Sequence, residues 1–168
     1  MRSFRSVGLN EEALVATTST LTTFDSVRPV LVPVDSAGCP ATVVGAAAEV
    51  CAGLGAMAIL LEVVRSTDGV QRGVRVRGGA VDAVLGDDTC AHLRDLAEVF
   101  RSQGVDVSLS VREGDLVSTI LAEAQGTGAQ MIVMGPHEGA GRVVSIQPSV
   151  AETVVQSASV PVMVVRVA

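Results

Sequence analysis

Short apolar segments alternate with segments of helical periodicity along most of this chain, and this alternation restricts the folds that it can adopt. Pro29–Val34 and Met57–Val64 are compact apolar runs of strand length. Between them, apolar residues recur at helical spacing from Ala41 to the glycines at Gly53 and Gly55. A buried strand, a helix and a second buried strand make a βαβ unit, in which the two strands are parallel.

The same alternation continues to the C-terminus. The remaining predicted elements are a helix over Thr89–Gln103, a strand over Val105–Val111, a helix that starts at Gly114-Asp115, a strand over Gln130–Met134, a helix over Val150–Ala158 and a strand over Val160–Val167. This pattern predicts an α/β fold of the doubly wound class, a parallel sheet with helices on both faces. The length suits one domain, residues 28–168, after an N-terminal extension, residues 1–27, that shows no sustained periodicity.

Composition excludes several classes of function. The net charge is -6 and the chain has neither Trp nor Tyr, which argues against nucleic-acid binding. No apolar run approaches the ~20 residues that span a bilayer, and the first residues lack the continuous apolar core of a secretory signal. We therefore expect a cytoplasmic protein that binds neither nucleic acid nor membrane.

Four motifs, taken in order, resemble the universal stress protein family. They are VLVPVD from Val30, VREGD from Val111, MIVMG from Met131, and the ending VAETVV to PVMVVR. Each motif is weak alone, but their order and spacing are specific, and the resemblance covers roughly Arg28 to Arg166. It implies five parallel strands in the order 3-2-1-4-5. It also implies a homodimer in which the last strands, Val160 to Val167, pair antiparallel across a two-fold axis and cover an apolar edge.

The resemblance further implies a nucleotide site, for ATP or AMP, where the strand order reverses. The residues that it would use are Pro33 and the backbone of Val63 beside the base, Asp35 at the ribose or adenine, and Gly135, Ser149 and Val150 at the phosphates. Asp35 is equally well explained as a turn residue that caps the next amides. Ser149 with Glu152 also forms the pattern of a helix capping box, which is the commoner use of such a serine.

The phosphate-binding part of the pattern departs from the family. The family loop reads G-x-x-G-x9-G-S/T, and its positions here hold Gly135, Glu138, Pro148 and Ser149. A carboxylate about 4 Å from a phosphate charge repels it by roughly 1 kcal/mol in water and by roughly 4 kcal/mol at an effective dielectric of 20. Proline has no N–H, and a lost bond to a charged oxygen removes roughly 1.5 to 3 kcal/mol. We expect weak ATP binding or none.

Other candidate residues have plainer interpretations. His137-Glu138 resembles the start of an H-E-x-x-H metal motif, but Gly141 stands where the second histidine would be, so we predict no metal. His92 falls on the polar face of its predicted helix. The three cysteines form no C-x-x-C pair; Cys51 suits the core, and Cys39, in a turn, is a candidate for oxidation. No motif indicates a catalytic Ser-His-Asp or Cys-His set.

Charged residues near the predicted site add two further expectations. Glu62 is expected to place a second acid close to the pocket. The segment Arg65 to Gly86 concentrates arginines among glycines and suits a flap or a small hairpin. We hypothesise that one of its arginines, or Arg142, pairs with Glu138 and closes the crevice, although a solvated loop is favoured because exposed ion pairs are weak. The arginines concerned are Arg72, Arg75 and Arg77.

Three functions follow, in this order. The first is a non-catalytic, dimeric stress-response protein with a degenerate nucleotide site and a regulatory role through protein partners. The second is a nucleotide-binding sensor or slow ATPase that uses ATP or cyclic AMP. The third is a redox-responsive module that acts through Cys39.

Overall fold

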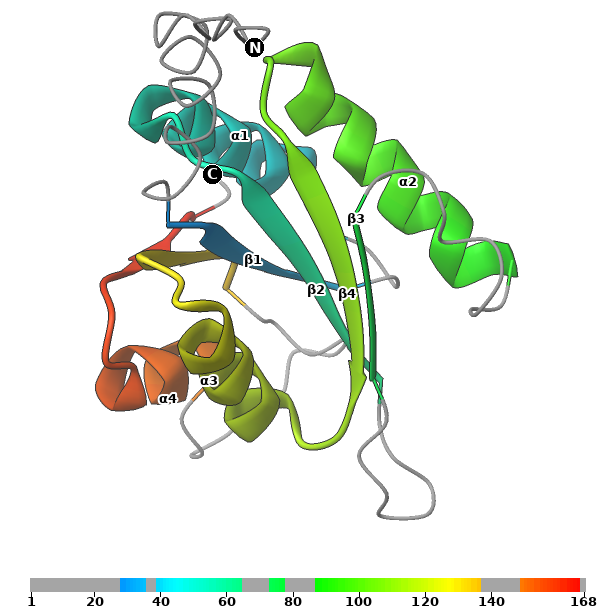
Figure 1. Ribbon diagram of the computed structural model, residues 1–168. Coiled ribbons are helices and arrows are strands. Elements are labelled where there is room, and N and C mark those ends of the chain that lie inside the picture. Colours follow the sequence, from blue (N-terminus) through cyan, green and yellow to red (C-terminus); the bar gives the residue numbers. More distant parts are fainter. Residues whose placement is uncertain (1–27, 36–38, 65–72, 78–86, 137–148, 167–168) are drawn as a thin grey trace, which may run out of the picture.

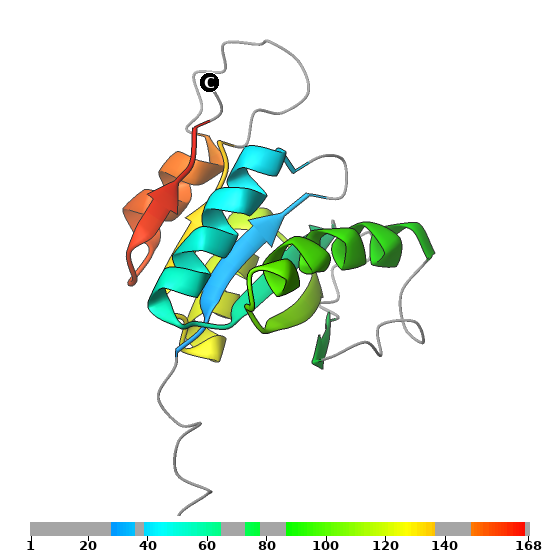
Figure 2. The same cartoon turned by 90° about the horizontal axis from the view of Figure 1, so that it is seen from above.

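The computed structural model describes residues 28–35, 39–64, 73–77, 87–136 and 149–166. They form one sheet with helices α1 and α2 on one face and α3 and α4 on the other (Figures 1 and 2). The elements are β1 (Val30–Val34), α1 (Ala41–Leu54), β2 (Ala58–Val64), β3 (Gly73–Arg77), α2 (Asp87–Ser102), β4 (Val107–Glu113), α3 (Leu116–Thr127), β5 (Met131–Met134), α4 (Val150–Ser157) and β6 (Val162–Val164).

The predicted fold class is confirmed. The sheet has the order β3-β4-β2-β1-β5-β6. The five strands from β4 to β6 in this order pair parallel with their neighbours, which is the expected 3-2-1-4-5 arrangement. The order reverses at β1, which lies between β2 and β5.

Strand β3 is an addition that the sequence analysis did not place. Its neighbours in the chain, residues 65–72 and 78–86, lie outside the described residues, and so does most of the proposed flap. The central part, Gly73–Arg77, pairs antiparallel with β4, with Val74 opposite Val111 and Arg75 opposite Ser110. Helix α2 separates β3 from β4 in the chain, so local patterns did not reveal the pairing.

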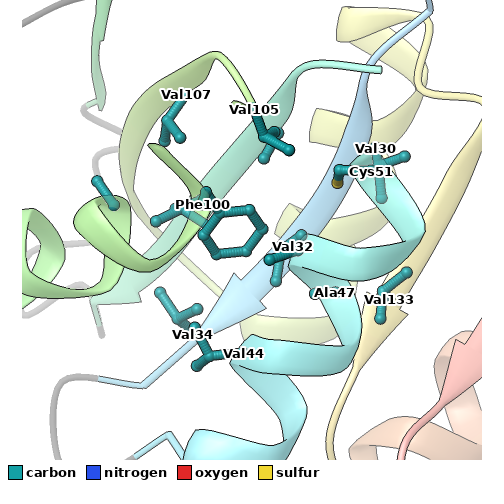
Figure 3. Packing of buried hydrophobic residues seen from close by; sticks show 14 of the residues in the cluster. Val30, Val32, Val34, Val44, Ala47, Cys51, Phe100, Val105, Val107 and Val133 are labelled. Carbon is teal, nitrogen blue, oxygen red and sulfur yellow. The ribbon is translucent and has the colours of Figure 1, made fainter. Parts of the chain in front are cut away.

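The larger of the two cores lies under α1 and α2. Phe100 of α2 is fully buried, and Figure 3 shows its ring among valines of β1 and α1 that belong to the same cluster, including Val32, Val34 and Val44. Cys51 is also fully buried in this cluster, as predicted. Burial raises the pKa of its thiol to about 11, so it remains a protonated, apolar side chain.

Local chemistry sets the helix ends near the carboxyl and amino edges of the sheet. Gly55 ends α1 with a left-handed φ of 60°, and its N–H reaches the last carbonyls of the helix. Asp115 begins α3 by accepting a hydrogen bond from the Ser118 amide at 3.0 Å. The hydrogen bonds from Ser118 lower the pKa of Asp115 below its ordinary value.

Among the described helices, none combines the length and the apolar character needed to cross a bilayer.

Candidate functional site

The carboxyl ends of β1 and β5 lie next to each other, where the strand order reverses. Leu31 of β1 is in register with Ile132 of β5, so the residues that follow the two strands, Asp35 and Gly135, emerge at the same edge of the sheet. Asp35 is exposed and Pro33 is half-buried. In open parallel sheets this edge is where ligands bind.

Pro33 and Val63 lie on the face of the sheet that α3 and α4 cover. Side chains alternate between the two faces of a strand, and Leu31, two residues before Pro33, belongs to the α3/α4 core cluster. Val63 packs against the same cluster. Helix α4, which begins at Val150, stands on this face too, so Pro33, Val63 and Val150 share one side of the sheet edge.

Glu62 lies on the opposite face from Pro33 and Val63, so it does not add an acid beside these two residues. Its register partners Val34 and Val111 both belong to the cluster under α1 and α2. Glu62 is 3% exposed, and its Oε2 has no hydrogen-bond partner within the described residues. Side chains along a strand point alternately to the two faces of the sheet, so Glu62 and its neighbour Val63 point to opposite faces.

Gly135 allows the end of β5 to pack closely against α1. A Cβ atom at this position would lie 3.1 Å from Cγ2 of Val43, a residue that is fully buried in α1. That distance is shorter than an ordinary van der Waals contact, so a side chain here would force Val43 to shift. Packing therefore explains this glycine without a ligand.

Ser149 and Glu152 form the predicted capping box at the start of α4. The Ser149 hydroxyl accepts a hydrogen bond from the Glu152 amide at 3.2 Å, and the Ser149 amide donates to Oε2 of Glu152 at 2.8 Å. Val150, the first residue of the helix, is half-buried. The box uses two of the amides that point out of the helix end, and these are the donors that an anion at this position would need.

Several predicted residues lie outside the described residues. They are His137, Glu138, Gly141, Arg142 and Pro148 in the loop between β5 and α4, together with Arg72. The proposed ion pair between Glu138 and an arginine, and the altered part of the phosphate loop, therefore remain predictions from the sequence.

A cleft of about 330 Å³ lies between α4 and β6. Pro33, Asp35 and Val63 do not line it, so the cleft is displaced from the residues predicted to contact the base and ribose. Ser149, which the resemblance assigned to the phosphates, is part of the lining. Figure 2 shows α4 in orange beside β6 in red at one end of the sheet. The lining residues are Pro136, Ser149, Ala151, Glu152, Val155, Gln156, Val164 and Arg166. Sequence reasoning did not find this cleft, since its walls come from a helix and a strand that meet only in the fold.

The environment of Cys39 opposes a redox role. Burial raises the pKa of its thiol, and the negative charge of Asp35 raises it further. The thiolate is the reactive form of cysteine, and a raised pKa reduces its population at neutral pH. The structure does not describe the side chain of Cys90.

A buried polar cluster between β4 and α3 was also missed by the sequence analysis. Glu123 of α3 is 6% exposed; its carboxylate accepts a hydrogen bond from Ser110 Oγ at 2.8 Å and pairs with Arg112 Nε at 2.9 Å. Two features could have indicated it: Ser108, Ser110 and Arg112 occupy alternate positions of β4, and Glu123 falls on the apolar face of its helix. The cluster joins α3 to β4, which β2 and β1 separate from β5 in the sheet.

Comparisons with known proteins agree with this architecture. The family model described as the universal stress protein family matches residues 26–166. No curated protein sequence gives a significant match. Among solved structures, a universal stress protein in complex with cAMP superposes with a TM-score of 0.62 at 16% identity, over 85% of this chain and 100% of the other.

Two further structures from named organisms show the same fold. A universal stress protein from Archaeoglobus fulgidus in complex with dAMP has a TM-score of 0.54 at 19% identity, over 81% of this chain and 95% of the other. The universal stress protein UspA from Lactobacillus plantarum has a TM-score of 0.57 at 21% identity, over 84% of this chain and 100% of the other. The family model covers most of the chain and the sheet order agrees with it, and the chain therefore belongs to the universal stress protein family.

Proposed function

We propose that this protein is a dimeric, non-catalytic stress-response protein of the cytoplasm, whose nucleotide site is degenerate and binds ATP weakly or not at all. The observation that carries the proposal is the capping box at α4, in which the carboxylate of Glu152 already accepts the Ser149 amide at 2.8 Å. A phosphate at this helix end would have to displace a carboxylate of the same charge sign. The protein would then have a regulatory role through protein partners and would catalyse no reaction.

The contacts of Gly135 and Ser149 support the proposal of weak ATP binding or none. Gly135 is explained by its contact with Val43, and the hydroxyl of Ser149 accepts the Glu152 amide at 3.2 Å. In the sequence, Glu138 and Pro148 replace two glycines of the family loop, which adds a negative charge and removes an N–H donor. Each of these features opposes the binding of a triphosphate.

Calorimetry is expected to show no submicromolar affinity for ATP, with or without magnesium. The reason is the combined loss of phosphate donors and gain of negative charge in the loop, each worth roughly 1 kcal/mol or more. The titration should use ATP, AMP and cyclic AMP in parallel, with the protein in its native assembly. Submicromolar ATP binding would contradict the proposal.

A sensor of adenine nucleotides, or a slow ATPase, is the second candidate. It is favoured by the two structural neighbours that were solved with cAMP and with dAMP, ligands that carry one phosphate. A single phosphate needs fewer donors than a triphosphate and tolerates an altered loop better. Tighter binding of cyclic AMP or AMP than of ATP in the same calorimetry would support this candidate, and measurable phosphate release from ATP would support the ATPase.

The free edge of β6 supports the homodimer. Within the described sheet β6 has a neighbour on one side only, and Val162–Val164 carries no charge. Met163 and Val164 are each 37% exposed. The opposite edge is formed by β3, which contains Arg75 and Arg77, and charged edges discourage pairing between sheets. A second copy is therefore expected to pair along β6.

Replacing Met163 with Asp is expected to convert the dimer into a monomer, because it places a charge in the middle of the apolar edge strand. Light scattering at micromolar concentration should report twice the chain mass of 17.1 kDa for the wild type and a single chain mass for Met163→Asp. Val99→Asp is the matched control, since Val99 is 38% exposed on α2, away from β6. A monomeric wild type, or an equal effect of both variants, would rule out this interface.

A further inference from the structure

An ion pair between β4 and α3 lies at the carboxyl edge of the sheet, beside Val63. Arg112 is the penultimate residue of β4, and its register partner in β2 is Val63. Neighbouring strands lie about 4.8 Å apart, so the two residues are adjacent along this edge. Val63 packs against the α3/α4 cluster and Arg112 pairs with Glu123 of α3, so both side chains lie on the face that α3 and α4 cover. Figure 1 shows β4 turning into α3 at this edge.

The guanidinium of Arg112 is held from one side. Its Nε donates to Oε2 of Glu123 at 2.9 Å and its Nη2 donates to Oε1 at 3.4 Å. The side chain of Glu123 is 7% exposed, whereas that of Arg112 is 28% exposed and reaches the surface. Within the described residues, both N–H groups of Nη1 and the second N–H of Nη2 have no partner. These N–H groups form a second fork, which suits two adjacent acceptors on one ligand.

A buried hydroxyl near this pair also lacks a partner. Thr119 is 7% exposed, and its Oγ1 accepts or donates no hydrogen bond within the part of the chain that the structure describes. It precedes Glu123 by four residues, so the two side chains share one side of α3. Because α3 begins just after the carboxyl end of β4, Thr119 lies nearer to that edge than Glu123 does. Buried polar atoms are normally hydrogen-bonded, and this exception indicates a place for a polar atom of a ligand.

The charges at this place favour an uncharged ligand over an anion. Arg112 and Glu123 neutralise each other, so a phosphate at the free fork would also meet the carboxylate of Glu123. Two neutral acceptors avoid that repulsion. The O6 and N7 atoms of a 6-oxopurine, such as guanine or hypoxanthine, are adjacent acceptors that both arms of an arginine fork can bind. Adenine carries an N–H donor in place of O6, and this donor would face the N–H donors of the arginine.

We propose that the carboxyl edge between β2 and β4 binds the base of a 6-oxopurine nucleoside, with O6 and N7 held by the free fork of Arg112. Val63, which is half-buried, supplies an apolar surface for the ring, and Glu123 positions the guanidinium. The inference rests on the proposed function in one respect: the phosphates are not recognised, so the base determines which ligand binds. It differs from the adenine-nucleotide sensor in the base that it selects.

Inosine and adenosine are the probes, because they differ at C6 of the base and neither carries a phosphate. Titrations of the full chain, followed by amide chemical shifts, are expected to show inosine binding at least about tenfold more tightly than adenosine, the usual discrimination of a bidentate contact. Arg112→Lys keeps the charge but loses the fork, so it should remove most of this preference. Arg101→Gln is the matched control, since it alters an exposed, ion-paired arginine of α2, and it should keep the preference.

The largest shifts on adding inosine are expected at Val63, Arg112 and Gly114. Absence of inosine binding at millimolar concentration, equal affinities, tighter binding of adenosine, or a preference that Arg112→Lys retains would overturn the inference. The comparison of the two nucleosides on the wild type needs no variant, so it decides the matter even if Arg112→Lys does not fold. Calorimetry with ATP tests the proposed function separately: submicromolar ATP binding would contradict that function, whereas a missing preference for inosine would contradict this inference alone.

Discussion

Changing both Glu138 and Pro148 to glycine is expected to create or strengthen ATP binding. Removal of the carboxylate should relieve a repulsion of roughly 1 to 4 kcal/mol, which corresponds to about one to three decades of affinity. Restoring a backbone N–H at position 148 should add roughly 1.5 to 3 kcal/mol. Calorimetry on the wild type and the double variant, at one magnesium concentration, measures the gain directly.

Single variants separate the two causes. Glu138→Gln removes the charge but retains the side chain, and Pro148→Ala restores the N–H without the freedom of glycine. We expect each to recover part of the affinity and the double glycine variant to recover the most. If a folded double variant binds ATP no better than the wild type, then the altered loop does not limit binding. If the wild type already binds ATP tightly and the double variant changes little, the sensor hypothesis takes precedence.

Phe100→Ala is expected to destabilise the domain by about 3 to 5 kcal/mol, the usual range for removing a fully buried phenylalanine. The ring lies at the centre of the cluster that joins α2 to β1 and α1 (Figure 3), and it has no exposed surface. Its loss leaves a cavity that the surrounding valines, which are stiff at χ1, fill poorly. Urea denaturation at fixed protein concentration should show a lower midpoint with little change in slope.

Two controls accompany this measurement. Phe100→Leu keeps much of the volume and should lower the stability by less than about 2 kcal/mol. Val99→Ala, at a neighbouring residue that is 38% exposed, should stay within about 0.5 kcal/mol of the wild type. A Phe100→Ala variant as stable as Val99→Ala would show that this ring does not organise the core.

Much of the fold was predictable because its signals are local. The apolar runs at β1 and β2, the glycine that ends α1 and the capping box of α4 each depend on residues close together in the chain. Right-handed crossovers then leave few ways to arrange parallel strands. Element ends were less certain: the strand expected over Val160–Val167 is Val162–Val164 in the structure, since single residues at strand ends carry weak preferences.

The candidate site was predicted less completely. The sequence placed Asp35 and Gly135 at neighbouring strand ends, which the pairing of β1 with β5 explains. It expected Glu62 close to the pocket without deciding its face, and the register of β2 with both neighbours places it under α1 and α2. The phosphate contact assigned to Gly135 stays a prediction, and the structure adds a close approach of α1 to this glycine that no local pattern reveals.

By itself, then, the sequence determined the class of fold through the order of its apolar and amphipathic segments. Its four motifs indicated the family, and the residues at positions 138 and 148 gave the chemistry of the altered loop, since each of these signals is written in neighbouring residues. The tertiary structure alone decided that β3 pairs with β4, that Glu123 is buried against Arg112, and that α4 and β6 enclose a cleft beside Arg166. The physical reason is that these features bring together groups distant in sequence. Their free energy comes from packing and pairing that exist only once the sheet has formed.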